Sequence, residues 1–133
     1  MEQPFPFAHP FAADSLSEFV RAYLIAAVFT DEPEGSEYTI GDLHPDFVDA
    51  SYSDCTAFFR IFVIRMTPDE MRDFPWSQAG HDFWLTRNHH GAGFWEKGRN
   101  YPPHWFCTVE RMCKLCEIFG ETEAVFIQES EDE

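Results

Sequence analysis

The chain has 133 residues, of which 44% are apolar and 17% aromatic, which is enough for a single domain with one core and excludes intrinsic disorder for most of its length. Its 24 acidic residues outnumber its 9 basic ones, so the formal net charge is −15. A surface this negative repels nucleic acid and anionic membranes and attracts basic proteins. No apolar run approaches the ~20 residues that a membrane-spanning helix needs.

The acidic residues are concentrated toward the two ends of the chain. Residues 1–50 hold ten acidic residues and one basic residue, residues 51–90 hold five and four, and residues 91–133 hold nine and four. Two interpretations fit this distribution. The acidic regions either keep the surface solvated or form a negative patch that a basic protein recognises.

The first half of the chain is predicted to form two helices. Ser15 and Glu18 have the spacing of a capping box, and apolar residues then recur at helical spacing over residues 16–29. A polar loop containing Pro and Gly follows. Pro45 is suited to a first helical turn, where its missing N–H is not needed, and it begins a second predicted helix over residues 45–66.

The next feature, residues 81–97, is predicted to be a β-hairpin. Aromatic runs flank Asn88–Gly91, whose residues tolerate the positive φ angles of a tight turn. Alternation would place Asp82, Trp84 and Thr86 on one face of the first strand, and His81, Phe83, Leu85 and Arg87 on the other.

The remaining elements complete a predicted α+β fold. A third helix is predicted over residues 104–119, stopped by Gly120, and a third strand over residues 124–128. The domain, residues 1–133, would pack a small antiparallel three-stranded sheet, made of hairpin 81–97 and strand 124–128, with three main helices, 16–29, 45–66 and 104–119. Residues 1–13 would form an extended arm rich in Pro and Phe, and residues 129–133 a frayed acidic tail.

The hairpin sequence resembles a block found in small, mostly uncharacterised proteins of bacteriophages and related mobile elements. The block reads GHDFWLTRN-x-HGAGFW, and it matches residues 80–88 and 90–95. Position 89 is often glycine in that pattern, whereas this chain has His89. The resemblance implies a setting, a small protein made during infection that acts on host machinery, and it implies no activity.

Histidines and an acidic residue in the hairpin are candidate metal ligands: His81, Asp82, His89 and His90. Alternation would send the first two to opposite faces of the sheet, and the other two are adjacent, an arrangement that rarely chelates one ion. Polar contacts with the turn are therefore the favoured interpretation, and neither a metal nor a cofactor is predicted.

Two cysteines, Cys113 and Cys116, have the spacing of zinc and redox motifs. They lie about eight residues into the third predicted helix, whereas a redox pair works at a helix N-terminus. Cys107 lies about 240° around that helix from Cys113. With Cys55, these residues are interpreted as buried free thiols in a reducing cytosol.

The leading functional hypothesis is an acidic phage accessory protein of the anti-defence or host-takeover type. It would act in the cytoplasm of an infected bacterium, where it would bind and inhibit a basic, nucleic-acid-handling host protein by presenting carboxylates in place of phosphates. The predicted contact residues are acidic: Asp31, Glu32, Glu34, Glu37, Asp46 and Asp49.

The alternative is a small enzyme or ligand-binding module with a pocket at the hairpin tip. The pocket residues would be Trp84, Arg87, Asn88, His90 and Trp95. The same residues could instead form an interface hot spot, a structural network in which Arg87 pairs with Asp82 or Glu96, or a direct nucleic-acid contact that the surface charge opposes. No Ser-His-Asp order, phosphate-binding loop or carboxylate pair is evident in the sequence, so nothing in it requires catalysis.

Overall fold

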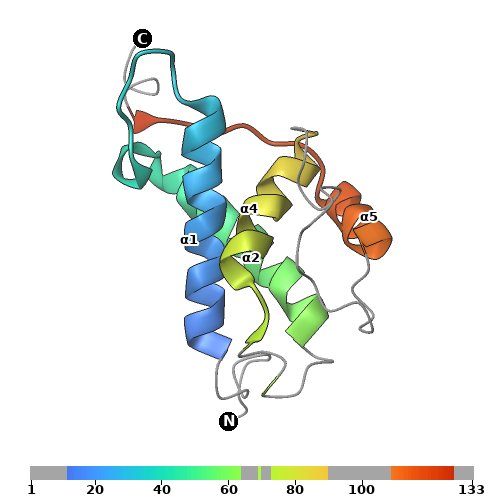
Figure 1. Ribbon diagram of the computed structural model, residues 1–133. Coiled ribbons are helices and arrows are strands. Elements are labelled where there is room, and N and C mark those ends of the chain that lie inside the picture. Colours follow the sequence, from blue (N-terminus) through green and yellow to red (C-terminus); the bar gives the residue numbers. More distant parts are fainter. Residues whose placement is uncertain (1–11, 64–68, 70–72, 90–108, 128–133) are drawn as a thin grey trace.

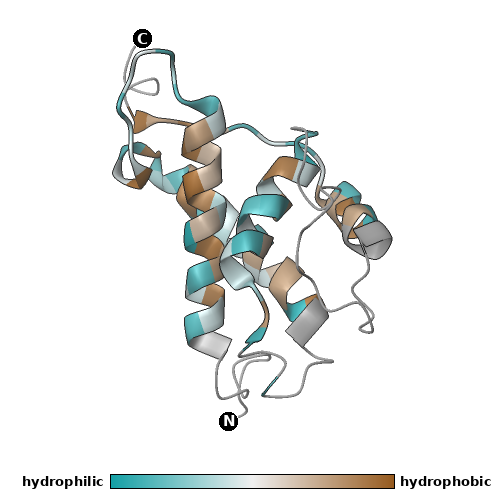
Figure 2. Ribbon diagram, viewed as in Figure 1, coloured by the Kyte–Doolittle hydropathy of each residue, from teal (hydrophilic) through white to brown (hydrophobic). Residues whose placement is uncertain are grey.

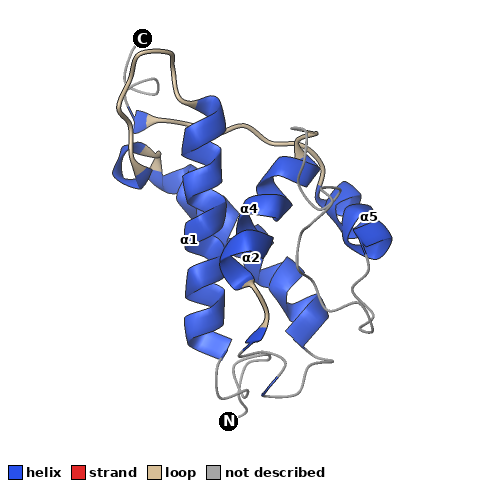
Figure 3. Cartoon of the chain, in the orientation of Figure 1, coloured by secondary structure: helices blue, strands red, loops and turns tan. Residues whose placement is uncertain are grey.

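The computed structural model describes residues 12–63, 69, 73–89 and 109–127, and over these residues the chain is helical (Figures 1 and 3). The elements are α1 (Ala12–Asp31), the 3₁₀ helix η1 (Ile40–Asp42), α2 (Pro45–Val63), α4 (Trp76–Arg87) and α5 (Val109–Phe119). No β-strand occurs in this part of the chain. The predicted α+β class with a three-stranded sheet is therefore wrong.

Helix α1 is the element against which α2 and α4 pack, because one of its faces is apolar from end to end, while α5 packs against α4. Its buried residues recur every three or four positions: Leu16, Phe19, Val20, Tyr23, Leu24, Ala27 and Val28. The helix is longer than the predicted 16–29 and includes residues 12 and 13, which were assigned to the extended arm. Ser15 is buried inside the helix, so the predicted capping box is wrong. Glu18 instead accepts a hydrogen bond from the hydroxyl of Ser77 (3.0 Å).

Helix α4 occupies the place of the first strand of the predicted hairpin. Six of its eight buried residues form a stripe at helical spacing that starts before the predicted hairpin: Trp76, Ala79, Gly80, Phe83, Trp84 and Arg87. The other two, Asp82 and Thr86, are buried beside the stripe. The alternation seen from His81 onward covers too few residues to distinguish a strand from a helix, and the residues that begin the helical stripe precede it. The second half of the predicted hairpin, residues 90–97, lies outside the described residues.

Helices α1 and α4 run in the same direction and lie side by side (Figure 1). Near their starts Ser77 bonds to Glu18, and near their ends the indole N–H of Trp84 donates to the hydroxyl oxygen of Thr30 (2.8 Å). Between these contacts lies Gly80, where a Cβ atom would collide with the carbonyl oxygen of Phe19. The close approach of the two backbones therefore requires glycine at this position.

The core between the helices is built mainly from aromatic rings, contributed by α1, α2 and α4. Phe58 stacks on Phe83 with ring centroids 4.2 Å apart, and Phe19 stacks on both at 5.8 and 6.0 Å. Trp76 closes the lower end against Phe59 at 4.7 Å. Figure 2 shows apolar and polar residues alternating along these helices, as expected when each buries one face.

The end of α4 explains the turn chemistry that suggested a hairpin. Asn88 is the C-cap, and His89 has a φ of 58°, the left-handed conformation that usually follows a helix. The residues do favour positive φ, as the sequence indicated. They terminate a helix here instead of joining two strands.

The predicted strand 124–128 is reduced to a single β-bridge. Phe126 pairs antiparallel with Leu43, and the backbone N–H of His44 donates to the carbonyl oxygen of Val125 (2.7 Å). The pairing cannot extend, because α2 begins at Pro45, which has no N–H to offer a partner strand. Residue 128 and the predicted tail 129–133 lie outside the described residues.

The other predicted helix boundaries agree more closely with the structure. Helix α2 begins at Pro45 as predicted, and the described helix ends at Val63, with residues 64–66 outside the description. Helix α5 ends at Phe119, and Gly120, with a φ of 75°, follows it as the predicted stop. Residues 104–108 of the predicted third helix, and residues 1–11 of the predicted arm, are not described. None of the described helices is apolar over a length sufficient to cross a membrane.

Candidate functional site

Segments from three parts of the chain meet around the side chain of Phe126. Phe126 is 1% exposed, and its ring lies 4.8 Å, centroid to centroid, from that of Tyr38. The bridge to Leu43 and the hydrogen bond between His44 and Val125 add backbone contacts. The loop after α1, the start of α2 and the segment after α5 are thereby held together at the upper left of Figure 1.

Two of the predicted contact residues hold this junction together. A carboxylate oxygen of Asp31 accepts a hydrogen bond from the backbone N–H of Ala124 (3.0 Å). Glu32 accepts hydrogen bonds from the hydroxyl of Ser36 (2.9 Å) and from the backbone N–H of Tyr38 (3.3 Å). Both carboxylates are half-buried and already bonded, so their first role is to fix the loop.

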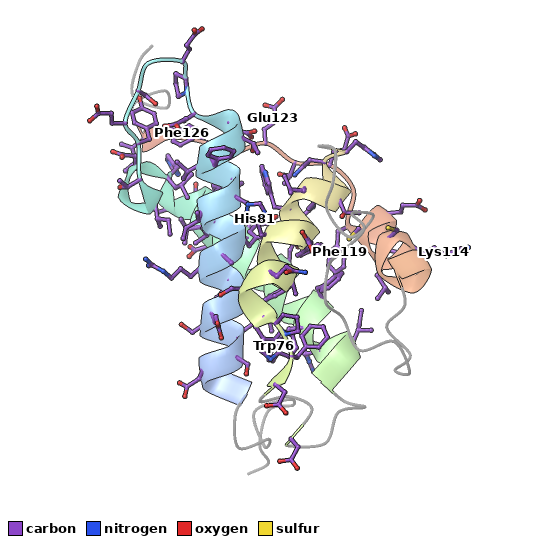
Figure 4. All side chains as sticks on the ribbon, viewed as in Figure 1. Trp76, His81, Lys114, Phe119, Glu123 and Phe126 are labelled. Atoms are coloured by element: carbon purple, nitrogen blue, oxygen red, sulfur yellow. The ribbon has the colours of Figure 1, made fainter. Side chains whose placement is uncertain are left out.

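The other predicted contact residues are exposed: Glu34, Glu37, Asp46 and Asp49. The side chain of Asp46, in the first turn of α2, is 91% exposed. Glu123, which the sequence did not single out, is also exposed and lies beside the C-terminal end of α1 (Figure 4). We refer to these five carboxylates as the acidic end.

Basic side chains are missing from the sequence that forms most of the acidic end. Between Arg21 and Arg60 there are eight acidic residues and no lysine or arginine. His44 lies in this stretch, and its Nδ1 accepts a hydrogen bond from the backbone N–H of Asp46 (3.1 Å). The C-terminal end of α1 adds the negative pole of its helix dipole.

The second predicted site, around Arg87, is an interior hydrogen-bond network. Arg87 is 4% exposed, and its Nη1 donates to the hydroxyl of Tyr23 (2.9 Å) and to a carboxylate oxygen of Asp54 (2.8 Å). Its Nε donates to the carbonyl oxygen of Gly120 (2.7 Å) and its Nη2 to that of Phe119 (3.0 Å). One guanidinium therefore links α1, α2 and α4 to the end of α5, with each of its three nitrogens engaged.

The neighbours of Arg87 in the predicted pocket are also internal. Trp84 is fully buried. Asn88 donates through Nδ2 to the carbonyl oxygen of Trp84 (3.0 Å) and accepts through Oδ1 from the backbone N–H of Thr122 (2.8 Å). His90 and Trp95 lie outside the described residues. The three described members form structural contacts instead of lining an open cavity.

Of the two predicted ion pairs of Arg87, the one with Asp82 rested on a hairpin, and among the described residues Arg87 pairs with Asp54 instead. Asp82 lies on the same helix, one and a half turns earlier, and is fully buried. Glu96 is not in the described part of the chain.

The candidate metal ligands are dispersed by the helix. His81 is half-buried and lines a groove between α1 and α4, while Asp82, about 100° around the same helix, is in the interior. His89 is exposed, with its Nε2 3.3 Å from a carboxylate oxygen of Glu121, and His90 lies outside the description. Across residues 12–63, 69, 73–89 and 109–127, no three His, Cys, Asp or Glu side chains are grouped to hold a metal ion.

Three of the four cysteines are free and buried, as predicted: Cys55, Cys113 and Cys116. Cys107 is not described. Burial raises the pKa of all three thiols, and that of Cys113 rises to about 11, with the Glu117 carboxylate adding to the effect. Thiols with raised pKa values are poor nucleophiles and poor metal ligands at neutral pH.

The raised thiol pKa values predict that the protein loses stability in alkali. An unfolded Cys113 ionises near pH 9.0 and the folded one near 11, so between these values the unfolded chain releases a proton that the native state retains. The free energy of unfolding therefore falls as the pH rises through this window. Urea unfolding followed by circular dichroism at pH 8 and pH 10.5 measures the loss. Cys113→Ala should reduce this pH dependence, and an unchanged slope would contradict the assignment.

No match to a protein-family model, a curated protein or a solved structure is found for this chain.

Sequence reasoning missed the partners of Arg87. Tyr23 belongs to the apolar stripe of α1, and Asp54 borders that of α2 next to the buried Cys55. An acidic residue at the edge of an apolar stripe is a detectable signal for a buried ion pair. The hairpin prediction directed the search to neighbours in the sequence instead.

Proposed function

We propose that this protein binds a basic partner protein through its acidic end. The observation that carries the proposal is the set of exposed carboxylates on segments fixed around Phe126, without lysine or arginine between Arg21 and Arg60 to neutralise them. Such a surface attracts a protein with a cationic surface and increases the rate at which the two proteins associate.

The partner class is a protein that handles nucleic acid. Such proteins carry clustered Lys and Arg side chains to neutralise phosphates, so they are the proteins most strongly attracted to a carboxylate-rich surface. Occupation of that cationic surface would exclude the nucleic acid, which makes inhibition the expected effect. The phage-protein block that residues 80–88 and 90–95 resemble would add a role in counteracting host defence or in host takeover.

The Arg87 network supports no comparable case for an enzyme or a ligand pocket. A ligand would have to compete with the hydrogen bonds that the buried guanidinium already makes to Asp54, Phe119 and Gly120.

Neutralising the acidic end tests the proposal. We expect Glu37→Gln/Asp49→Asn to weaken the retention of basic nucleic-acid-binding proteins from a bacterial lysate by about tenfold at low salt, since two attractive charges are removed. Quantitative mass spectrometry of the retained proteins at increasing salt is the measurement.

The matched control is Asp14→Asn/Glu117→Gln, which changes net charge equally at exposed sites on α1 and α5. The control should retain partners as the unmodified protein does. If both double variants lose the same amount of retained protein, retention depends on net charge alone and not on the acidic end. If the unmodified chain retains no basic protein, the proposal is overturned.

A further inference from the structure

An apolar groove of about 490 Å³ lies between α1 and the η1–α2 region. Its α1 wall is formed by residues that are almost completely buried: Leu16, Val20 and Leu24. Ile40 of η1 and Tyr52 of α2, the latter 50% exposed, line the opposite side. The volume falls in the range of roughly 300–1,000 Å³ that is usual for ligand pockets, so it can receive large apolar side chains.

The groove has few polar groups that could orient a small molecule. Ser17 and Arg21 lie on its α1 side, and the phenol of Tyr52 on the other. Small-molecule sites generally add convergent, buried polar groups to an apolar lining. An open apolar channel beside two helices is instead typical of a site that takes the apolar stripe of another helix.

Charge is distributed unequally around the groove. On the α2 side, the exposed Asp49 lies one helical turn before Tyr52. Asp42, two residues after Ile40, is half-buried and already accepts a hydrogen bond from the backbone N–H of Thr39 (2.8 Å). On the α1 side the charged lining residue is Arg21. An incoming helix would therefore be favoured with its basic residues toward α2 and its apolar residues in the groove.

We propose that the groove between α1 and α2 binds the apolar stripe of a basic amphipathic helix in the partner protein. This inference rests on the proposed function and extends it, because Asp49 belongs to the acidic end and borders the groove through Tyr52. The carboxylates attract the basic side chains of the helix, and the groove removes its apolar side chains from water. Affinity then depends on apolar spacing as well as on charge.

Two synthetic peptides test this inference by isothermal titration calorimetry. One is a helix of about 18 residues, or five turns, with Leu at positions i, i+3, i+4 and i+7 and Lys elsewhere. The other has the same lysines but Gln in place of each Leu. We expect the Leu peptide to bind at least about tenfold more tightly, since burial of one leucine contributes roughly that factor.

Variants assign the binding to the groove. Ser17→Trp fills it from an exposed position and should weaken the Leu peptide by about tenfold, while Ser53→Trp, at an exposed position of α2 outside the lining, should change affinity less than about twofold. Tyr52→Ala removes the opposite wall and should also weaken binding. Arg21→Glu should strengthen it, because repulsion of the lysines is replaced by attraction.

The outcomes separate this inference from the proposed function. Equal binding of both peptides, unaffected by Ser17→Trp, would overturn the groove inference and leave the acidic end as the binding surface. Leu-peptide binding that Ser17→Trp abolishes but Glu37→Gln/Asp49→Asn and salt do not alter would overturn the proposed function. Binding of neither peptide would overturn both. A homodimer that Ser17→Trp dissociates, without effect on peptide binding, would assign the groove to a second copy of the chain.

Discussion

Replacing Gly80 with alanine is expected to cost about 3 kcal/mol or more of unfolding free energy. The added Cβ would collide with the carbonyl oxygen of Phe19 and would lie 3.1 Å from the backbone nitrogen of Tyr23. These are backbone atoms of α1, so no side-chain rotation relieves the contact. The two helices would have to separate, which exposes the aromatic core between them, and overpacking of this kind costs about 1–3 kcal/mol even where side chains can adjust.

Gly41→Ala is the matched control. Gly41 is exposed, and a Cβ there would meet the hydroxyl oxygen of Thr39 at 3.5 Å, an ordinary van der Waals distance. We expect this substitution to change stability by less than about 0.5 kcal/mol. Urea unfolding of both variants, followed by far-UV circular dichroism, gives the comparison. Equal midpoints for Gly80→Ala and the unmodified protein would show that α1 and α4 do not cross at this residue.

Gly80 also explains why the sequence led to the wrong fold class. Glycine disfavours helices, and the predicted hairpin began just after it, although Trp76 and Ala79 before it continue the spacing of Phe83 and Trp84 after it. Its helical role depends on the position of Phe19, which is far away in the sequence. A tertiary contact of this kind overrides the low helix propensity of glycine, and it leaves no pattern in the sequence around Gly80 from which it could be predicted.

Helices with long apolar stripes were predictable because periodicity and end signals agree. Pro45 marks the start of α2, and Gly120 follows the end of α5. The stripe of α1 was read correctly, but its N-terminal end was not, because Ser15 is a good cap residue that is buried inside the helix instead. Capping motifs constrain a helix end only when the residues before them cannot continue the helix.

The sequence could predict that a carboxylate is exposed where the surrounding loop sequence alone determines its position at the surface. Glu34 and Glu37 lie in a loop punctuated by Pro and Gly, and such loops lie on the surface. Asp31 and Glu32 come from the same acidic run, yet they bond to Ala124 and to the backbone of Tyr38. Which carboxylates remain available to a partner thus depends on where the segment after α5 returns in the fold.

Replacing Arg87 with methionine is expected to destabilise the protein by about 3 kcal/mol. Methionine preserves much of the side-chain length but none of the donors, so the Asp54 carboxylate and the carbonyl oxygens of Phe119 and Gly120 lose their partner. Removing one member of a buried ion pair costs about 3–5 kcal/mol, and Asp54 is 38% exposed, so water compensates part of the loss. Contacts of the guanidinium with the rings of Phe83 and Phe119 are lost as well.

Two further variants separate the parts of the network. Arg87→Lys keeps the charge, but the three N–H groups on its single nitrogen cannot serve all four acceptors of the guanidinium, so we expect a loss between those of Arg87→Met and the unmodified protein. Asp54→Asn retains an acceptor for Nη1 and should cost about 1 kcal/mol. Thermal unfolding by calorimetry ranks the three, and the order Met, Lys, Asn from most to least destabilised is the expected result.

The same variants decide between a structural network and a ligand pocket around Arg87. At a temperature where Arg87→Met is still folded, the acidic end is unchanged, so binding of the lysine-rich peptides should match that of the unmodified protein. A pocket would give the opposite pattern, unchanged stability with lost binding, because its guanidinium would be free to contact a ligand. Arg87 is buried and four of its five N–H groups already donate hydrogen bonds, which is why stability is the property that should respond.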